Sequence, residues 1–578
     1  MSSSSSSTTS NPIKIRDIVG ESIDNSKFGF YQIYILLVCW GALFADGAEM
    51  LVISLLSHEL EKSFKWTKAE SSHYIGILGS LTFFGFLIGS LWGGKLIDIY
   101  GRRNLFILFN FCTFIFGFLS ALATSFWILA LCRFLTGLGV GGSIPCATAV
   151  LAEICPTKQR RKLILLKTVG FVLGEILMAF EAGLVLPILA PEKAWRRLLI
   201  LASIPGFVAF ALASVFLDES PRFIALRIAR KEFDMKQLTD ENKIKEETEK
   251  TKNSRQRLVD ILNRIRGRNE SVRACCNKNN ANTNGNTIPL VPEEELKTKV
   301  NIFPRPKKQG QIMDLFKSTK QQPDRTRVTI LLFFVWFIQS YMYYVCGKFY
   351  SPKKLKHDIF SLTYHSFIRY VPQGVIFIFP ITLRHEGDSA KSMTGKVMIA
   401  ASGELLGAFS AIFLVDFPFF GTRRLLLFEQ ALAAIAFFSC AWIAALPDST
   451  QNRAIIFFWF VFSTKIFTNA TFDLVFPYTA EYYPTRLRGT GVGYGSSAAR
   501  VGGMVTPYVA LHLHQHFGKH FPYMNFTIAA CVGVAFVYFL PEVNDMFEEI
   551  QDNNTKKHLG DNDEADLEGE GVALLSAE

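Results

Sequence analysis

The sequence predicts an all-α membrane protein that crosses the bilayer about twelve times, in two similar halves. Of its 578 residues, 49% are hydrophobic and only 19% are charged, and the mean hydropathy is +0.23. These values are unusual for a soluble enzyme of this length. The apolar residues gather in stretches of roughly 20 residues, the length that a helix needs to cross a bilayer. A phrase in the first half, AEICPTKQRR from Ala152, recurs as AEYYPTRLRG from Ala480, which indicates two related halves.

The long apolar stretches define the predicted spans. In the first half they cover Tyr31–Leu56, Tyr74–Ile99, Asn104–Ala123, Phe126–Val150, Leu163–Leu189 and Leu198–Leu217. In the second half they cover Val328–Val345, Val397–Val415, Leu425–Ala445, Ala454–Tyr478, Gly491–His512 and Tyr523–Leu540. A soluble protein with buried helices would not contain so many long apolar runs.

The charges that flank these spans predict the orientation. Basic residues cluster after the second, fourth, eighth and tenth spans, whereas the gap after the third has none. Because positive charge stays on the cytoplasmic side, both termini are expected in the cytoplasm. The gap after the seventh span breaks the pattern, since it carries an apolar piece around 366–390 and basic residues that include Lys353, Lys354, Lys356 and Arg369. We interpret that piece as an outer-loop insertion or a re-entrant segment; an additional crossing there would invert everything that follows.

The polar segments complete the predicted organisation. Residues 1–27 form a disordered cytoplasmic N-terminus, 28–222 the first six-helix bundle, 223–325 a cytoplasmic linker, 326–543 the second bundle, and 544–578 an acidic cytoplasmic tail. The linker is basic, so we expect it to meet anionic membrane lipid rather than nucleic acid. In the tail, Glu570, Leu574 and Leu575 fit the acidic dileucine pattern read by endosomal and vacuolar sorting adaptors, a pattern that also arises by chance.

A short loop after the second span contains residues suited to a latch. GGKLIDIYGRR places Gly94, Asp98, Gly101, Arg102 and Arg103 at fixed offsets. Glycine permits close helix contact and a tight turn, while Asp98 can cap the next helix or pair with a basic residue. The equivalent loop of the second half, DFPFFGTRRLLL, contains a similar set: Asp416, Gly421, Arg423 and Arg424.

These motifs resemble those of the major facilitator superfamily. The Gly94–Arg103 loop is similar to that family's signature between its second and third spans, and LDESPRF from Leu217, RFLTGLGVGG from Arg133 and LPE from Leu540 resemble further family segments. FADGAEMLVISLL from Phe44 and SSAARVGGMVTPY from Ser496 look most like the synaptic-vesicle-protein-related and organic-ion branch, which also includes sugar-porter-like members. Two departures are visible: Ile99 replaces a usual basic residue, and the short gap Ser57–Ser72 lacks a glycosylation sequon, which favours the synaptic-vesicle side.

The resemblance implies a fold and a gate. It implies two pseudo-symmetric six-helix bundles that rock to give alternating access. The repeated acidic and basic phrases would then form a cytoplasmic gate, to which Glu153, Arg160, Glu481 and Arg488 belong together with the latch residues. The alternative is that they only anchor helix ends.

Charges inside the first half are expected to couple transport to protons, because intramembrane charges are costly and usually functional. Asp46 and Glu49 lie three residues apart, on one helix face. In proton-coupled porters that this chain resembles, an acid of the first span works with an arginine of the fourth, which here is Arg133. A permanent structural ion pair is the alternative. Glu175, or Glu181, in the fifth span could replace the first-span acid.

In the second half, Arg500, Lys465 and Asp473 are candidate substrate-binding residues. Relatives that carry anions have arginine near the position of Arg500, and a buried guanidinium can hold a carboxylate through two parallel hydrogen bonds. The aromatic residues that could stack on a flat substrate are Tyr341, Tyr343, Tyr344 and Trp459. We therefore favour a small organic anion. An organic cation or a sugar stays open, as does internal pairing of Arg500 with Asp473, with the aromatic rings facing lipid.

The sequence thus favours a secondary transporter over an enzyme. Gly137, Gly139 and Gly142 match a dinucleotide fingerprint but lie in an apolar helix without a preceding strand, so we interpret them as packing positions. No metal-ligand spacing, cofactor motif or nucleophile and base arrangement is apparent. The favoured function is proton-coupled symport of a small-molecule substrate, in the plasma membrane or in a vesicle or vacuole membrane. The alternative is a non-transporting vesicle or receptor protein on the same scaffold.

Overall fold

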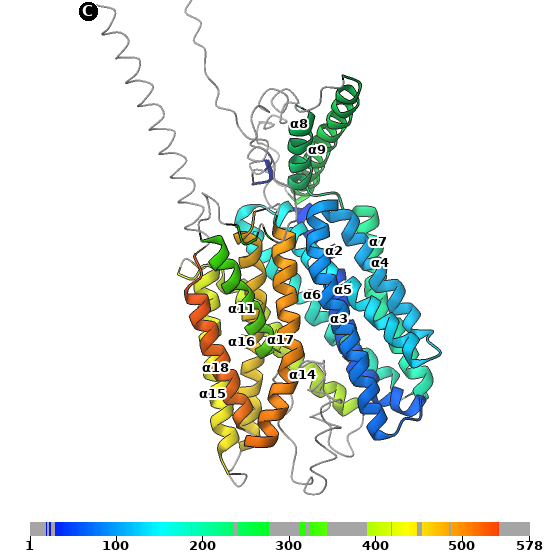
Figure 1. Cartoon of the computed structure of the whole chain (residues 1–578), viewed down its shortest axis with the longest axis vertical. Coiled ribbons are helices and arrows are strands. Elements are labelled where there is room, and N and C mark those ends of the chain that lie inside the picture. The colour runs from blue at the N-terminus through cyan, green and yellow to red at the C-terminus, as the bar shows by residue number, and fades with distance from the viewer. Residues whose placement is uncertain are drawn as a thin grey trace, which may run out of the picture.

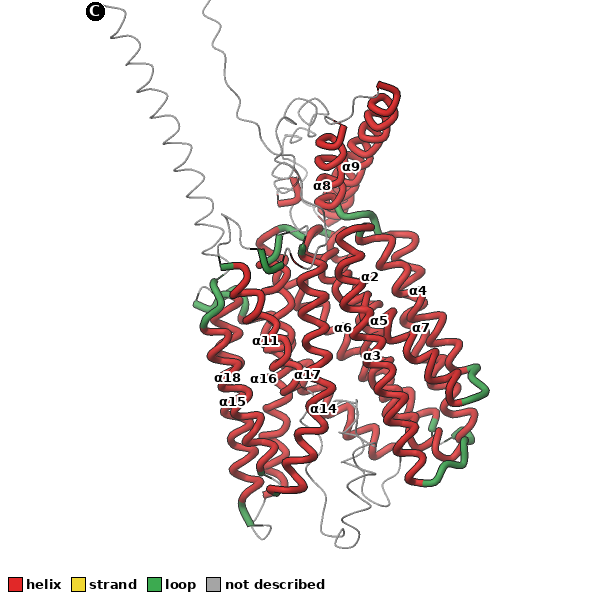
Figure 2. Tube along the Cα trace, viewed as in Figure 1, coloured by secondary structure: helices red, strands yellow, loops and turns green. Residues whose placement is uncertain are grey.

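The computed structural model confirms the predicted all-α fold, with twelve long helices in two bundles (Figure 1). It describes residues 19, 22–24, 29–186, 188–235, 241–276, 313, 315–317, 324–343, 390–417, 419–447, 453–484, 487–518 and 520–542. In these ranges every regular element is a helix (Figure 2). The predicted insertion around 366–390 and the sorting residues of the tail fall outside them.

Each bundle contains six long helices that coincide with the predicted spans. The first has α2 (Phe30–Ser63), α3 (Lys68–Tyr100), α4 (Arg102–Ala121), α5 (Phe126–Ile154), α6 (Thr157–Val185) and α7 (Pro191–Phe216). The second has α11 (Arg325–Tyr343), α14 (Ala390–Leu414), α15 (Thr422–Ala445), α16 (Arg453–Tyr482), α17 (Arg488–Phe517) and α18 (Phe521–Tyr538). In the described part, nine are long and apolar enough to cross a membrane by length and composition alone; α14, α16 and α17 are the other three.

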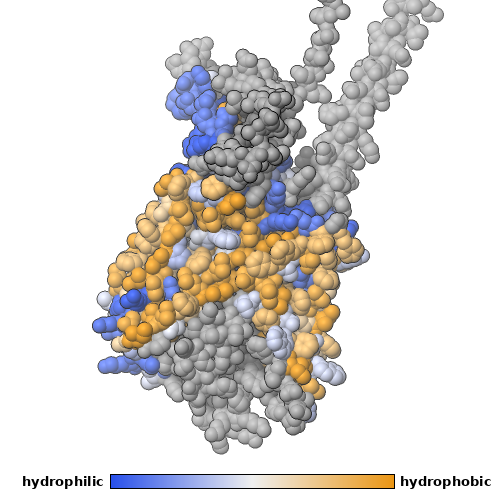
Figure 3. All heavy atoms as spheres, turned by 180° about the vertical axis from the view of Figure 1, so that it is seen from behind, coloured by the Kyte–Doolittle hydropathy of each residue, from blue (hydrophilic) through white to orange (hydrophobic). Residues whose placement is uncertain are grey.

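Two further helices lie in the predicted linker. α8 (Pro221–Met235) packs against α9 (Glu241–Cys276), and both extend from one end of the bundles (Figure 1). Hydrophilic residues gather there, whereas a broad apolar band covers the visible face of the bundles (Figure 3). We call the end of the bundles that carries α8 and α9 the linker end.

Local sequence signals set the helix boundaries. Before α3, the Thr67 hydroxyl accepts a hydrogen bond from the Glu70 N–H, and the Glu70 carboxylate accepts one from the Thr67 N–H. This reciprocal capping satisfies two N–H groups that the first turn leaves free. At the linker end, Gly101 (φ +107°) and Gly421 (φ +62°) precede α4 and α15. Residues with side chains rarely adopt this left-handed backbone, so glycine permits both tight turns.

Small residues allow the two bundles to approach closely. α3 packs against α17, and α6 packs against α14. A Cβ atom added to Gly94 would lie 2.5 Å from the carbonyl oxygen of Gly489, and one on Gly493 would lie 2.5 Å from that of Ser90. Inside the first bundle, a Cβ on Gly137 would collide with the Thr82 carbonyl oxygen. The glycines that imitate a dinucleotide fingerprint are therefore helix-packing positions, as predicted.

Candidate functional site

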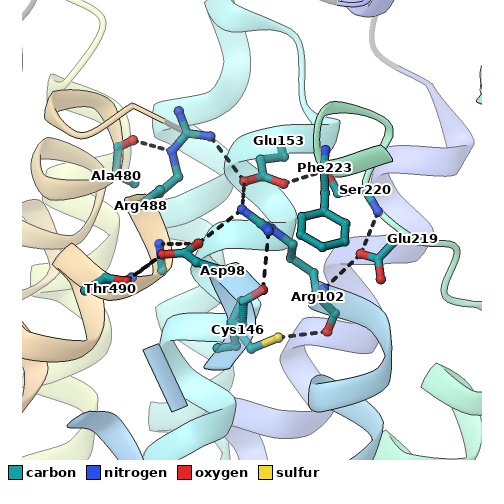
Figure 4. Close-up of polar contacts among 12 residues, drawn as sticks. Asp98, Arg102, Cys146, Glu153, Glu219, Ser220, Phe223, Ala480, Arg488 and Thr490 are labelled. Atoms are coloured by element: carbon teal, nitrogen blue, oxygen red, sulfur yellow. Dashed lines mark hydrogen bonds and ion pairs between the residues drawn. The ribbon is translucent and has the colours of Figure 1, made fainter. Parts of the chain in front are cut away.

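Arg102 is the centre of a buried ion-pair network at the linker end (Figure 4). Its Nη2 lies 2.9 Å from Oε1 of Glu153 and 3.2 Å from Oδ1 of Asp98. Its guanidinium also lies over the Phe223 ring, 4.5 Å from the centroid. The side chains of all three charged residues are 0% exposed. The arginine thus compensates two carboxylates that would be costly to bury alone.

Asp98 joins the two bundles by capping a helix of the other bundle. Its Oδ2 accepts hydrogen bonds from the N–H and the hydroxyl of Thr490, both 2.7 Å long, and its Oδ1 accepts one from the Gly489 N–H at 3.3 Å. Gly489 and Thr490 lie in the first turn of α17, whose N–H groups have no partner inside the helix. A carboxylate there also interacts favourably with the helix dipole. Asp98 is therefore an N-cap supplied from α3.

Three more acidic residues of the predicted gate contact the opposite bundle. Oε1 of Glu153 lies 3.7 Å from Nη1 of Arg488. Both carboxylate oxygens of Glu481 accept from Nε of Arg161 at 3.0 Å. Oδ2 of Asp416 lies 2.7 Å from Nζ of Lys162, in a half-exposed pair. The two repeated phrases thus bond to each other's bundle; Arg161 and Lys162 are partners that the sequence did not single out.

The other basic gate residues bond within their own bundle. Arg103 donates to the carbonyl oxygens of Leu217 (2.5 Å) and Ser214 (2.9 Å), and Arg423 donates to those of Tyr538 (2.5 Å) and Val537 (3.4 Å). These equivalent arginines fasten the end of the sixth helix of each bundle. Arg160 donates to Thr157 in its own helix, and Arg424 donates to the Phe419 carbonyl oxygen.

The acidic residue after the sixth helix of each bundle caps the third. Glu219 accepts from the Arg102 N–H at 2.8 Å, and Glu542 accepts from the Arg423 N–H at 3.4 Å. This cap explains why both LDESPRF and LPE contain an acidic residue.

Burial raises the pKa of Glu219 even though backbone N–H groups donate to its carboxylate. Nearby, loss of water and the charges of Arg160 and Arg488 lower the pKa of Arg222 to about 9. Positive charge is therefore crowded at this end.

A central pocket lies between the bundles and brings three predicted site residues together. Asp46 of α2, Asp473 of α16 and Arg500 of α17 line it. Its empty volume is about 480 Å³, including the part open to solvent. The rest of the lining is Leu43, Ile144, Thr168, Phe171, Tyr343, Asn469, Phe472 and Phe476. Charged groups inside a mainly apolar, aromatic pocket are typical of a small-molecule site.

Glu49 and Arg133 form a buried ion pair away from this pocket. Oε2 of Glu49 lies 2.5 Å from Nη1 of Arg133, and the two side chains are 1% and 0% exposed. Nη2 of Arg133 also donates to the Ser120 hydroxyl at 2.6 Å. The structure therefore separates the two acids of the first span: Asp46 lines the pocket, whereas Glu49 faces the interior of the first bundle. Of the alternative acids, Glu175 is 3% exposed in α6.

Apart from Tyr343, the remaining predicted binding residues that the structure describes do not line the pocket. Lys465 forms a buried ion pair with Glu404, 2.5 Å between Nζ and Oε1. The Tyr341 hydroxyl donates to Asn525 at 2.6 Å, toward α18, and Trp459 is 60% exposed on the bundle surface. Tyr344 lies outside the described residues. Tyr343, which was predicted with these two tyrosines, lines the pocket and supplies its phenol.

Two buried charges beside the pocket wall escaped the sequence analysis. Lys167 of α6 is 0% exposed, and its Nζ lies 4.1 Å from the centroid of the Phe476 ring in the opposite bundle. Its charge interacts with the carboxylates of Asp473 and Asp46. Glu404 of α14 holds Lys465 and accepts a hydrogen bond from the Tyr343 hydroxyl at 2.6 Å. Both lie inside predicted spans, so the rule that flags intramembrane charge would have found them.

Comparison with known proteins identifies the family. The model of the sugar (and other) transporter family matches residues 35–283 and 291–553. The synaptic vesicle 2-related protein of Xenopus laevis is 27% identical over 501 residues, 86% of this chain and 76% of the relative. The organic cation/carnitine transporter 7 of Arabidopsis thaliana is 27% identical over 498 residues, 86% of this chain and 89% of the relative.

A solved structure shows the same fold. The proton:xylose symporter XylE, bound to 6-bromo-6-deoxy-D-glucose, superposes with a TM-score of 0.61 over 89% of this chain and 96% of that one, at 17% identity. Together, the family match over most of the chain, the two bundles and the synaptic-vesicle-2-related relatives establish that this multi-pass membrane protein belongs to the sugar (and other) transporter family, within the major facilitator superfamily.

Proposed function

We propose that this protein moves a small organic ion across its membrane by alternating access, as a secondary active transporter coupled to protons. The observation that carries the proposal is the central pocket, where charged side chains of both bundles meet on aromatic walls. Rigid-body rocking around a fixed midplane site is how transporters of this architecture expose a substrate to each side in turn.

The linker-end network acts as the gate in this proposal. Asp98, Glu153 and Glu481 each bond to the opposite bundle. Rocking the bundles apart at this end breaks all of these contacts together, and closing them restores the cap on α17. We expect the linker end to face the cytoplasm, with both termini on that side. The described conformation is then the one closed to the cytoplasm.

Proton coupling is assigned to the Glu49 and Arg133 pair. A proton on Glu49 would remove the negative charge that holds Arg133, and the arginine would keep only its neutral partner Ser120 and a long contact with the Gly117 carbonyl oxygen. A buried pair that loses one charge is strongly destabilised, which favours rearrangement of α2 against α5. The XylE symporter, named for protons and xylose, supports this type of coupling in the same fold.

The favoured substrate is an organic ion with a carboxylate, held by Arg500. One relative is named for organic cations and carnitine, which supports a charged organic substrate. The synaptic-vesicle-2-related relatives favour a vesicle membrane, and a sorting adaptor at Glu570, Leu574 and Leu575 would serve that location.

Uptake into liposomes tests this proposal. Purified protein is reconstituted with an imposed pH gradient, and entry of labelled carboxylates, amines and sugars is measured. We expect carboxylate uptake that needs the gradient, that is lost in Arg500→Gln, and that no longer responds to the gradient in Glu49→Gln. Glu429→Gln changes a buried carboxylate of α15 that bonds Ser410 and is the matched control. Absence of uptake for every compound would favour a non-transporting scaffold, and uptake of amines that survives Arg500→Gln would refute the assignment of a substrate carboxylate to Arg500.

A further inference from the structure

Four charged residues, two acidic and two basic, lie in or directly behind the wall of the central pocket and are shared between the bundles. Asp46 and Lys167 come from the first bundle, and Asp473 and Arg500 from the second. Three of them line the pocket, while Lys167 lies behind the wall, with its Nζ over the pocket-lining Phe476 ring. The formal charges of these two carboxylates and two cations sum to zero.

Each cation faces the opposite bundle. Lys167 lies over Phe476 and interacts with Asp473, both on α16. Arg500 lies over the Phe86 ring of α3, 5.0 Å from its centroid, and interacts with Asp46 of α2. The pattern is reciprocal, so each bundle presents one acid and one base to the other across the pocket.

Part of this hydrogen-bonding capacity is unused in the described structure. Asp46 is 3% exposed, and its Oδ1 has no hydrogen-bond partner there. The ammonium of Lys167 likewise makes no hydrogen bond to the described residues. Asp473 is better satisfied, because its Oδ2 accepts from Nδ2 of Asn469 at 3.0 Å. Buried polar groups are normally bonded, so the open oxygen of Asp46 in the pocket wall indicates a ligand donor that satisfies it.

A substrate of one sign does not fit this pattern. A simple anion would meet two carboxylates as well as Arg500, and a simple cation would meet Arg500, with Lys167 behind the wall. A molecule that carries both signs can place each next to its complement and avoid leaving a buried charge uncompensated. Asp46 and Arg500 line the same pocket of about 480 Å³, so a molecule that fits it carries its carboxylate and its ammonium only a few bonds apart.

We propose that the pocket binds a zwitterion with the charge pattern of an amino acid, with its carboxylate on Arg500, its ammonium on Asp46, and its side chain among Phe171, Phe472 and Phe476. The assignment rests on the proposed transport function only for its route across the membrane, since binding is a property of the pocket itself. Lys167 sets the charge balance from behind the Phe476 ring, and Asp473 completes the acidic side.

The test measures binding and transport separately. The thermal stability of the purified full-length protein in detergent is recorded with each of the twenty common amino acids. The best ligand is then compared with its amine and carboxylic acid analogues, which lack the carboxylate and the ammonium respectively. We expect an amino acid with an apolar or aromatic side chain to raise the melting temperature, and both analogues to bind at least about tenfold more weakly, since a hydrogen bond to a charged group is worth about 1.5–3 kcal/mol.

Substitution of either charged pocket residue should change which ligand binds best, and the two substitutions should favour different analogues. Arg500→Gln should bind the amine analogue at least as well as the amino acid, and Asp46→Asn should do the same for the carboxylic acid, while Glu429→Gln keeps the wild-type order. A merely structural role would weaken all three ligands alike. Stabilisation by none of the amino acids, or equal stabilisation by an analogue, would overturn the proposal. Binding without uptake into liposomes would support the pocket and refute transport; gradient-driven uptake of a simple anion with no amino-acid binding would do the reverse.

Discussion

The hydrogen bond between Thr490 and Asp98 is predicted to hold the linker end closed. Thr490→Val removes the hydroxyl that donates to Oδ2 of Asp98 at 2.7 Å and keeps the shape of the side chain. The Thr490 N–H still donates to the same oxygen, so the cap on α17 is weakened rather than lost. A hydrogen bond to a charged group contributes about 1.5–3 kcal/mol. Because this one crosses the bundles, its loss raises the open population at the linker end about tenfold or more.

A cysteine introduced at the buried position of Ser496 can report the opening. Ser496 is 2% exposed, and its Oγ lies 3.4 Å from Oγ of Ser90 across the bundle interface. It lies about two turns below the start of α17, so a thiol at this position meets solvent through the linker end only when the bundles separate. Ser496→Cys is labelled with a water-soluble maleimide, and the rate is followed on that peptide by mass spectrometry. We expect Thr490→Val to accelerate labelling about tenfold.

Thr479→Val is the matched control, because the Thr479 hydroxyl accepts from Nε1 of Trp336 inside the second bundle at 3.0 Å. Its loss should lower thermal stability without accelerating labelling. Equal labelling rates in the two variants would refute the idea that the Asp98 cap gates the linker end.

Three further predictions concern other contacts. Asp24 accepts hydrogen bonds from the N–H and the hydroxyl of Thr157 at 2.7 and 3.0 Å. Asp24→Ala should therefore lower the free energy of unfolding by about 1 kcal/mol and speed amide hydrogen exchange in the first turn of α6. Unchanged exchange would contradict the proposed cap. Glu404→Gln should lower the free energy of unfolding by about 3–5 kcal/mol, because it leaves Lys465 buried without its carboxylate, and adding Lys465→Met should restore most of the loss in thermal denaturation. Gly94→Ala should prevent close contact of α3 with α17 and accelerate labelling of Ser496→Cys, whereas labelling at the wild-type rate would show that the interface yields.

The gate could be predicted from sequence because its residues are repeated and lie close to one another along the chain. Asp98 and Arg102 are four residues apart on adjacent helix ends, and Glu153 and Glu481 occupy equivalent phrases. Their partners were less visible. Thr490 has no charge, and its role follows only from its place in the first turn of a helix that another bundle approaches. Arg161 was one of several basic residues clustered after the fourth span, and only packing selects it as the partner of Glu481.

For the pocket, the sequence identified the charged residues but not the neighbours that they face. Asp46, Asp473 and Arg500 were found as intramembrane charges, but sequence spacing placed Asp46 and Glu49 together on one face. The tertiary structure turns Asp46 to the pocket and pairs Glu49 with Arg133, because the two carboxylates project to different neighbours of α2. The sequence did not distinguish the roles of the aromatic residues. Trp459 and Tyr343 are both aromatic residues of predicted spans, yet Trp459 is exposed and Tyr343 lines the pocket.

The sequence by itself determined the membrane class, the twelve helices and the two-fold repeat, because apolar runs of bilayer length and a duplicated phrase are properties of the chain in one dimension. The tertiary structure decided which charges meet. Lys167 and Phe476 are far apart in sequence and approach only because α6 and α16 pack across the bundle interface. A helix fixes its own faces, but the partner that each face meets depends on the packing of all the helices together.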